Sequence, residues 1–219
     1  MSLHEKLSQL NAEIIAALPA ESVTVMREQT QRLRESRIVA SAPKTGDRLK
    51  DFHLPNHLGE MRSLAALRER GPVVVTFYRG GWCPYCNLEL RAYQAVLPEI
   101  KTAGATLVAI TPELPDASLT TSEKNELEFE ILTDAHADYT RKLGLVFTLP
   151  EPLRPIYQGL GINLEEHNGE GQFDLPLAAT FVVDIDGAIA SAFVDADYTS
   201  RAEPTDVVEV LQSLVKQNA

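Results

Sequence analysis

Both cysteines of the chain, Cys83 and Cys86, lie in one Cys-Pro-Tyr-Cys motif. Residues 73–78, just before it, are a continuous run of β-branched and aromatic side chains, which is typical of a strand buried on both faces of a sheet. Two glycines follow this strand, and Pro84 suits the first turn of a helix because its missing N–H has no partner there. The spacing therefore predicts Cys83 near a helix N-cap and Cys86 one turn into that helix.

A helix N-terminus is a favourable place for a reactive thiol. It carries roughly half a positive charge and unpaired N–H groups, which stabilise a thiolate. Cysteine pairs of this kind have pKa values lowered to about 3.5–7.5, and the thiolate is the nucleophile. Their three-residue spacing also lets the two sulfurs form a disulfide with little backbone movement. The motif therefore indicates redox chemistry carried by Cys83 and Cys86.

A structural role or a metal-binding role accounts less well for the cysteine pair. Buried structural cysteines have no need of a glycine-introduced helix start with Pro-Tyr between them. A zinc site needs four ligands, or three and a water, and only His53 and His57 could complete one. These histidines fall on a predicted strand and turn upstream, where we interpret them as surface residues. We therefore expect no metal and no other cofactor.

Composition excludes several classes of partner. The 219 residues carry a formal charge of −11, which argues against nucleic acid or an anionic membrane as a partner. No apolar run approaches the ~20 residues of a membrane span, and the first residues lack the layout of a signal peptide. A single cysteine pair in a βαβ context favours redox chemistry in a reducing cytosol, so we expect a cytoplasmic protein.

The chain divides at a polar, turn-rich joint near Pro43. Residues 1–42 are predicted to be a helical extension, because leucine and isoleucine recur at helical spacing on both sides of Pro19. We expect this extension to pack on its own domain, and pairing with a second subunit, giving a homodimer, is the alternative. Residues 43–219 are predicted to form one α/β domain.

The order of elements in residues 43–219 is that of a thioredoxin-type α/β domain. A hairpin and short helix lead into the strand at 73–78. The redox helix is expected to end near Gly104 and leads to a second buried strand at 105–111, a unit that implies parallel pairing. An Asp-Gly turn at 186–187 predicts a hairpin, and an amphipathic helix at 206–216 closes the chain. We thus expect a mixed central sheet flanked by helices. Residues 148–176 are irregular and predict a binding insertion or a solvated connection, with Arg154 and Tyr157 as candidates to face the site.

From about Pro43 to Val215 the sequence resembles the alkyl hydroperoxide reductase and thiol-specific antioxidant family, the peroxiredoxins. The resemblance rests on the strand at 73–78, on the Thr-Phe-Val-Val-Asp-Ile-Asp-Gly hairpin at 180–187 and on the cysteine motif. Placing Phe77, Tyr78 and Glu89 on the family pattern puts Cys86 at the peroxidatic position.

The resemblance implies a thiol peroxidase. Cys86 would attack hydrogen peroxide or an organic hydroperoxide, Cys83 would resolve the sulfenic acid to a disulfide, and a thioredoxin or glutathione system would reduce it. The chain departs from the family at three places: Cys83 replaces a threonine, Arg79 replaces a proline, and the activating arginine falls on Ala178. Arg79 is the nearest substitute for that arginine, and we expect a slow peroxidase.

The cysteine motif is also similar to those of thioredoxin and glutaredoxin. Trp82 precedes the first cysteine as in thioredoxin, and the tetrapeptide is that of glutaredoxin. In those families the first cysteine attacks and the second resolves, so a thiol–disulfide oxidoreductase led by Cys83 is an alternative function. A redox-sensing interaction module, in which the disulfide alters a partner surface on the extension, is a third.

Overall fold

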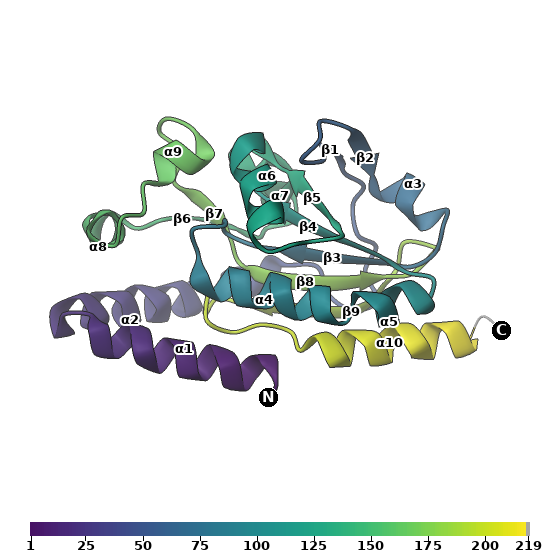
Figure 1. The fold of residues 1–219 in the computed structure, drawn as a ribbon, viewed down its shortest axis with the longest axis horizontal. Helices are drawn as coiled ribbons and strands as arrows, with labels where there is room; N and C mark the ends of the chain where they lie inside the picture. The colour runs from purple at the N-terminus through teal and green to yellow at the C-terminus, as the bar shows by residue number, and fades with distance from the viewer. Residues whose placement is uncertain (218–219) are drawn as a thin grey trace.

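The computed structural model describes residues 1–217, which form an α/β fold around a mixed five-stranded sheet (Figure 1). The strand order is β5-β4-β3-β8-β9, with β3, β4 and β5 parallel and with β8 and β9 antiparallel to their neighbours. This is the predicted mixed sheet flanked by helices. Its strands are β3 (Val73–Phe77), β4 (Thr106–Thr111), β5 (Glu130–Thr133), β8 (Ala178–Val183) and β9 (Ile189–Asp195).

Two small hairpins and a set of helices complete the described part of the chain. The hairpin strands are β1 (His53–Pro55) with β2 (Met61–Ser63), and β6 (Val146–Thr148) with β7 (Asp174–Pro176). The helices are α1 (Leu3–Ala17), α2 (Ala20–Glu35), η1 (Ile38–Ser41), α3 (Leu64–Arg68), α4 (Pro84–Ala95), α5 (Leu97–Thr102), α6 (Pro115–Lys124), η2 (Ala135–Ala137), α7 (Asp138–Lys142), η3 (Glu151–Leu153), α8 (Arg154–Gly159), α9 (Leu164–Asn168) and α10 (Pro204–Gln217). None of them is long and apolar enough to cross a membrane.

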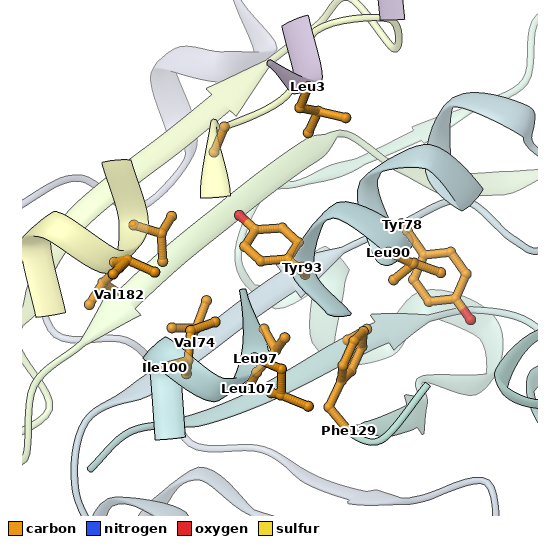
Figure 2. Packing of buried hydrophobic residues seen from close by; sticks show 14 of the residues in the cluster. Leu3, Val74, Tyr78, Leu90, Tyr93, Leu97, Ile100, Leu107, Phe129 and Val182 are labelled. Carbon is orange, nitrogen blue, oxygen red and sulfur yellow. The ribbon is translucent and has the colours of Figure 1, made fainter. Parts of the chain in front are cut away.

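The central strand β3 places side chains alternately on the two faces of the sheet. Val74 and Tyr78 enter the core under α4, α5 and α10 (Figure 2). Val75 and Phe77 enter the core on the opposite face, with α3 and α7. Thr76 lies between Val74 and Tyr78 in this alternation and so faces α4. The strand thereby places one hydroxyl beneath the helix that carries both cysteines.

The redox helix is shorter than the sequence indicated. We predicted one helix ending near Gly104, but α4 ends at Ala95 and α5 begins at Leu97. Pro98 lies in the first turn of α5, where its missing N–H is tolerated, whereas inside one continuous helix it would remove a hydrogen bond. The break leaves the start of α4, and hence the cysteines, where the sequence placed them.

The extension packs against the domain. Leu3 and Leu7 of α1 are buried in the core cluster that contains both cysteines, and Tyr85 of α4 donates a hydrogen bond to the side chain of Asn11 (3.0 Å). Helix α2 packs against η3 in the insertion. Figure 1 shows α1 beneath α4, with the N-terminus of α1 near the start of α10. The extension therefore covers the redox helix and its surroundings.

The division at residues 42 and 43 stays a prediction, and truncation tests it. We expect a chain beginning at Pro43 to fold cooperatively but with less stability, because burial of Leu3 and Leu7 is lost. Each leucine contributes about 1.5–3 kcal/mol, so the free energy of unfolding should fall by about 3–6 kcal/mol. Urea denaturation of the full and truncated chains measures the difference. A truncated chain without a cooperative transition would make the extension part of the domain.

Candidate active site

Cys83 and Cys86 occupy the first turn of α4. Cys83 is the N-cap, and its Sγ accepts a hydrogen bond from the backbone N–H of Cys86 at 3.4 Å. Pro84 stands at the first helical position, as its sequence context predicted. Both cysteines are free thiols with no exposed surface. The site in its reduced form is therefore closed to solvent at the sulfur atoms.

Arg79, four residues before the first cysteine, binds its sulfur. Its Nη2 lies 3.1 Å from Cys83 Sγ, and its Nη1 donates to the hydroxyl of Tyr157 at 2.9 Å. The guanidinium also lies against two aromatic rings, 4.4 Å from the ring centre of Tyr198 and 5.1 Å from that of Trp82. These contacts hold a buried positive charge beside Cys83.

A second arginine, Arg201, binds the other sulfur. Its Nη2 lies 3.3 Å from Cys86 Sγ, and its Nε donates to the carboxylate of Glu89 at 2.5 Å. Its Nη1 donates to the backbone carbonyls of Tyr198 and Ser200 in the loop after β9. Each thiol therefore has its own arginine, one from the end of β3 and one from a loop near the C-terminus.

Glu89 belongs to a buried hydrogen-bond network with Thr76 and Thr180. Its other carboxylate oxygen accepts from the hydroxyl of Thr76 (3.2 Å), which pairs with the hydroxyl of Thr180 on β8 (3.0 Å). Burial raises the pKa of Glu89 to about 7, although the charge of Arg201 opposes the shift. Glu89 is thus a buried acid, one helical turn beyond Cys86, that titrates near neutral pH.

The surroundings lower the pKa of Cys83 and raise that of Cys86. Burial alone would raise the pKa of Cys83, but the hydrogen bond from Cys86 and the charges of Arg79 and Arg201 outweigh it and lower this pKa to about 5. For Cys86, burial, the hydrogen bond to Cys83 and the neighbouring negative charge all raise the pKa. The surroundings therefore favour the thiolate at Cys83 over the thiolate at Cys86.

Of the two insertion residues singled out from sequence, Tyr157 reaches the site and Arg154 does not. Arg154 instead lies 3.8 Å from the ring centre of Phe173. His53 is largely exposed in the β1–β2 hairpin, and no group of three or more histidine, cysteine or acidic side chains suited to a metal occurs in residues 1–217. A zinc site at the cysteine motif therefore finds no ligand set in the described chain.

Sequence reasoning missed Arg201. The family's arginine position is occupied by Ala178, at the start of β8, which pairs with Asp195 at the end of β9. The loop that follows β9 therefore begins beside the place where that arginine would stand, and it delivers Arg201 to Cys86. The only sequence signal was a basic residue shortly before the last helix.

Comparison with known proteins agrees with this architecture. The AhpC/TSA family profile matches residues 45–192. Peroxiredoxin Bcp of Escherichia coli K12 is 26% identical over 152 residues, 69% of this chain and 86% of that protein. The crystal structure of peroxidoxin BcpB from Mycobacterium tuberculosis superimposes with a TM-score of 0.61 at 22% identity, covering 78% of this chain and 97% of that one. Peroxiredoxin 6 of Arenicola marina gives a TM-score of 0.64 at 15% identity, covering 79% and 74%.

The family match covers most of the chain, including both cysteines, and the structural neighbours share its fold. The chain therefore belongs to the AhpC/TSA family and is a peroxiredoxin-like enzyme that reduces peroxide by thiol chemistry on a thioredoxin-type fold.

Proposed function

We propose that this enzyme attacks its hydroperoxide with Cys83 and resolves with Cys86. This reverses the order expected from the family register, which placed the peroxidatic role on Cys86. The observation that carries the proposal is the contact between Arg79 and the Cys83 sulfur at a helix N-cap, which favours the thiolate there and leaves the proton on Cys86.

In the first step the Cys83 thiolate attacks the terminal oxygen of the hydroperoxide. A sulfur–oxygen bond forms, the oxygen–oxygen bond breaks, and the departing oxygen takes a proton to leave as alcohol or water. The sulfur is oxidised to sulfenic acid and the peroxide is reduced. Arg79 is placed to stabilise the negative charge that develops on the leaving oxygen, because its guanidinium lies beside the attacking sulfur.

In the second step Cys86 attacks the sulfenic acid. A disulfide forms, and the hydroxyl group leaves as water with the proton of the Cys86 thiol. Arg201, at 3.3 Å from Cys86 Sγ, stabilises the thiolate as that proton leaves. Glu89 holds Arg201 in place and can accept a proton near neutral pH.

We propose a thioredoxin or glutathione system as the reductant of the disulfide and the cytoplasm as the location of the enzyme, because such reductants keep thiols reduced there. Because both sulfurs are buried, in a core cluster that also contains Leu3 and Leu7 of α1, access for a protein reductant requires part of the surrounding structure to move. Homodimer formation also stays a proposal.

A thiol–disulfide oxidoreductase would use the same order of attack, so two assays are needed. We expect stopped-flow measurements to show consumption of hydrogen peroxide by the dithiol enzyme, recycled by thioredoxin and its reductase. Reduction of insulin disulfides without peroxide consumption would favour the oxidoreductase. Redox-dependent binding of a partner without turnover in either assay would favour a sensing module.

Mild oxidation is expected to give one intramolecular disulfide, Cys83 to Cys86. The two sulfurs lie on one helical turn, and the sequence has no third cysteine to compete. Mass spectrometry of peptides from the oxidised protein, without reduction, measures the pairing. Mainly intermolecular bridges would contradict the proposed resolving step.

A further inference from the structure

One loop contacts both arginines of the active site. Residues 196–203 connect β9 to α10, and Tyr198 lies in this loop. The ring centre of Tyr198 lies 4.4 Å from the guanidinium carbon of Arg79, nearer than the other ring that this arginine contacts. The backbone carbonyl of Tyr198 accepts a hydrogen bond from Nη1 of Arg201 at 2.5 Å. The ring also packs edge-on against Tyr85 of the cysteine motif, with 5.6 Å between the ring centres. Tyr198 therefore touches the arginine of each thiol and the redox helix.

Asp197 gives the loop its shape. Its carboxylate accepts hydrogen bonds from the backbone N–H of Thr199 (2.9 Å) and from the Thr199 hydroxyl (2.8 Å), and its carbonyl accepts from the N–H of Ser200 (3.0 Å). Aspartate side chains commonly fold turns in this way, by binding the backbone two residues on. The turn brings the carbonyls of Tyr198 and Ser200 to the same nitrogen of Arg201. The position of Arg201 thus depends on this turn.

The extension binds this loop at two points. On α2, Nη2 of Arg34 donates to the carboxylate oxygen of Asp197 that the turn does not use, at 2.7 Å. The carboxylate of Glu203 accepts from two backbone N–H groups at the start of α1, at 3.1 and 2.5 Å. Neither the extension nor the loop lies within residues 45–192, which match the family. The contacts that hold the loop are therefore made by parts of the chain outside that match.

We propose that Tyr198 is a positioning residue for peroxide reduction, held in place by the extension. Its ring keeps Arg79 beside the attacking thiol, and its carbonyl keeps Arg201 beside the resolving thiol. Arg34 acts through Asp197 on the same turn. The inference rests on the proposed order of attack, and it gives the extension a part in the chemistry in addition to its part in stability.

Tyr198→Leu tests the ring. Leucine keeps an apolar side chain at this position but has no π face to hold the guanidinium of Arg79. We expect the first peroxide turnover to slow by about 5- to 30-fold, the factor that corresponds to a partly desolvated cation–π contact. Disulfide formation should change less, because the carbonyl of residue 198 that binds Arg201 remains. Stopped-flow measurement follows the two steps. The matched control, Tyr198→Phe, keeps the ring and should keep the wild-type rates.

The pH dependence of the first turnover separates positioning from a loss of stability. The charged and titratable groups around the Cys83 sulfur are Arg79, Arg201, Cys86, Tyr85 and Tyr157. Tyr198→Leu changes none of these groups. If Arg79 is held less firmly beside the sulfur, the pKa of Cys83 rises, so the rate should begin to fall at a higher pH than in the wild type. A variant that is only less stable would lose amplitude and keep the wild-type profile.

Arg34→Gln tests the hold of the extension on the loop. The Arg34 side chain is 49% exposed, so its substitution leaves the core intact. We expect both steps to slow by about 2- to 5-fold, the factor that corresponds to one exposed ion pair. Arg34→Lys should restore the wild-type rates, and Arg32→Gln, at an exposed arginine on the same helix, should leave them unchanged. In Asp197→Asn the further change Arg34→Gln should have no effect. Wild-type rates in Arg34→Gln would contradict the role of the extension.

Failure of the positioning role and failure of the proposed function give different results. A first turnover that Tyr198→Leu changes neither in rate nor in pH profile overturns the positioning role, and peroxide consumption by the wild type would leave the proposed function standing. A wild type that consumes no peroxide overturns the proposed function instead. The positioning role is then tested in Cys86→Ser by the ultraviolet absorbance of the remaining thiolate, which titrates with the pKa of Cys83. A titration midpoint that the addition of Tyr198→Leu does not raise would overturn the role independently.

Discussion

Cys83→Ser is expected to abolish peroxide reduction, whereas Cys86→Ser should retain one fast turnover and then stop as the Cys83 sulfenic acid. The reason is the difference in acidity: Arg79 contacts the Cys83 sulfur and favours its thiolate, whereas burial and the neighbouring Cys83 raise the pKa of Cys86. In Cys83→Ser the effects of Cys83 on Cys86 are lost, but burial, the largest cause that raises the pKa of Cys86, remains, so the remaining thiol is expected to be the weaker nucleophile. Stopped-flow measurement of the first turnover, with each variant prereduced, gives the result.

A dimedone-type reagent, which labels sulfenic acids, identifies chemically which of the two cysteines attacks the peroxide. After one equivalent of peroxide, label on Cys83 in Cys86→Ser supports attack by Cys83. Label on Cys86 in Cys83→Ser, formed as fast as the wild type reacts, would restore the order that the family register implied. Serine is nearly the size of cysteine, so circular dichroism of both variants should match the wild type and serves as the control for folding.

The geometry of the cysteine motif could be predicted from sequence because every part of it is local. A buried strand, two glycines and Pro84 determine where α4 begins, and the cysteine spacing then determines which turn they share. The Asp-Gly hairpin and the closing helix were predictable for the same reason, since turn chemistry and helical periodicity need no knowledge of distant contacts.

The charges around the two sulfurs could not be predicted in this way. Arg201 lies 115 residues from Cys86 in sequence and reaches it only because β9 ends beside the start of β8. The partner of Arg201, Glu89, was visible only as a position in the family register. Matching the sequence to the family pattern compares residue positions and takes no account of the charges around them. For this reason it assigned attack to Cys86, whereas the buried charges favour Cys83.

The insertion was predictable in its extent but not in its role. Proline and glycine spacing indicated an irregular segment at residues 148–176, and the structure divides it into η3, α8 and α9 between the strands of the β6–β7 hairpin. Whether Tyr157 or Arg154 would face the cysteines depends on how η3 packs on α2. The contact between α2 and η3 joins two segments that are far apart in the sequence, so local sequence patterns do not predict it.

Arg79→Met is expected to slow the first peroxide turnover by about 10²- to 10³-fold, the usual effect of removing one preorganised donor from a developing negative charge. The same substitution removes the cation that holds the Cys83 thiolate, so it should raise the pKa of Cys83. The rate of the wild type should be constant at neutral pH and should fall as the pH decreases through about 5, where the thiolate is protonated. In Arg79→Met this fall should begin at a higher pH.

The second arginine supplies the matched control. Removing Arg201 alone would leave Glu89 as an unpaired buried carboxylate, which destabilises a protein by about 3–5 kcal/mol, so the control is the double variant Glu89→Gln, Arg201→Met. Arg201 contacts Cys86 and Glu89 binds Arg201, so loss of the pair should slow disulfide formation more than the first turnover. Following peroxide consumption and disulfide formation separately by stopped-flow, with tryptophan fluorescence from Trp82 as the second signal, distinguishes the two steps. If both variants slow the same step, the two arginines do not serve separate thiols, and attack by Cys83 with resolution by Cys86 loses its electrostatic basis.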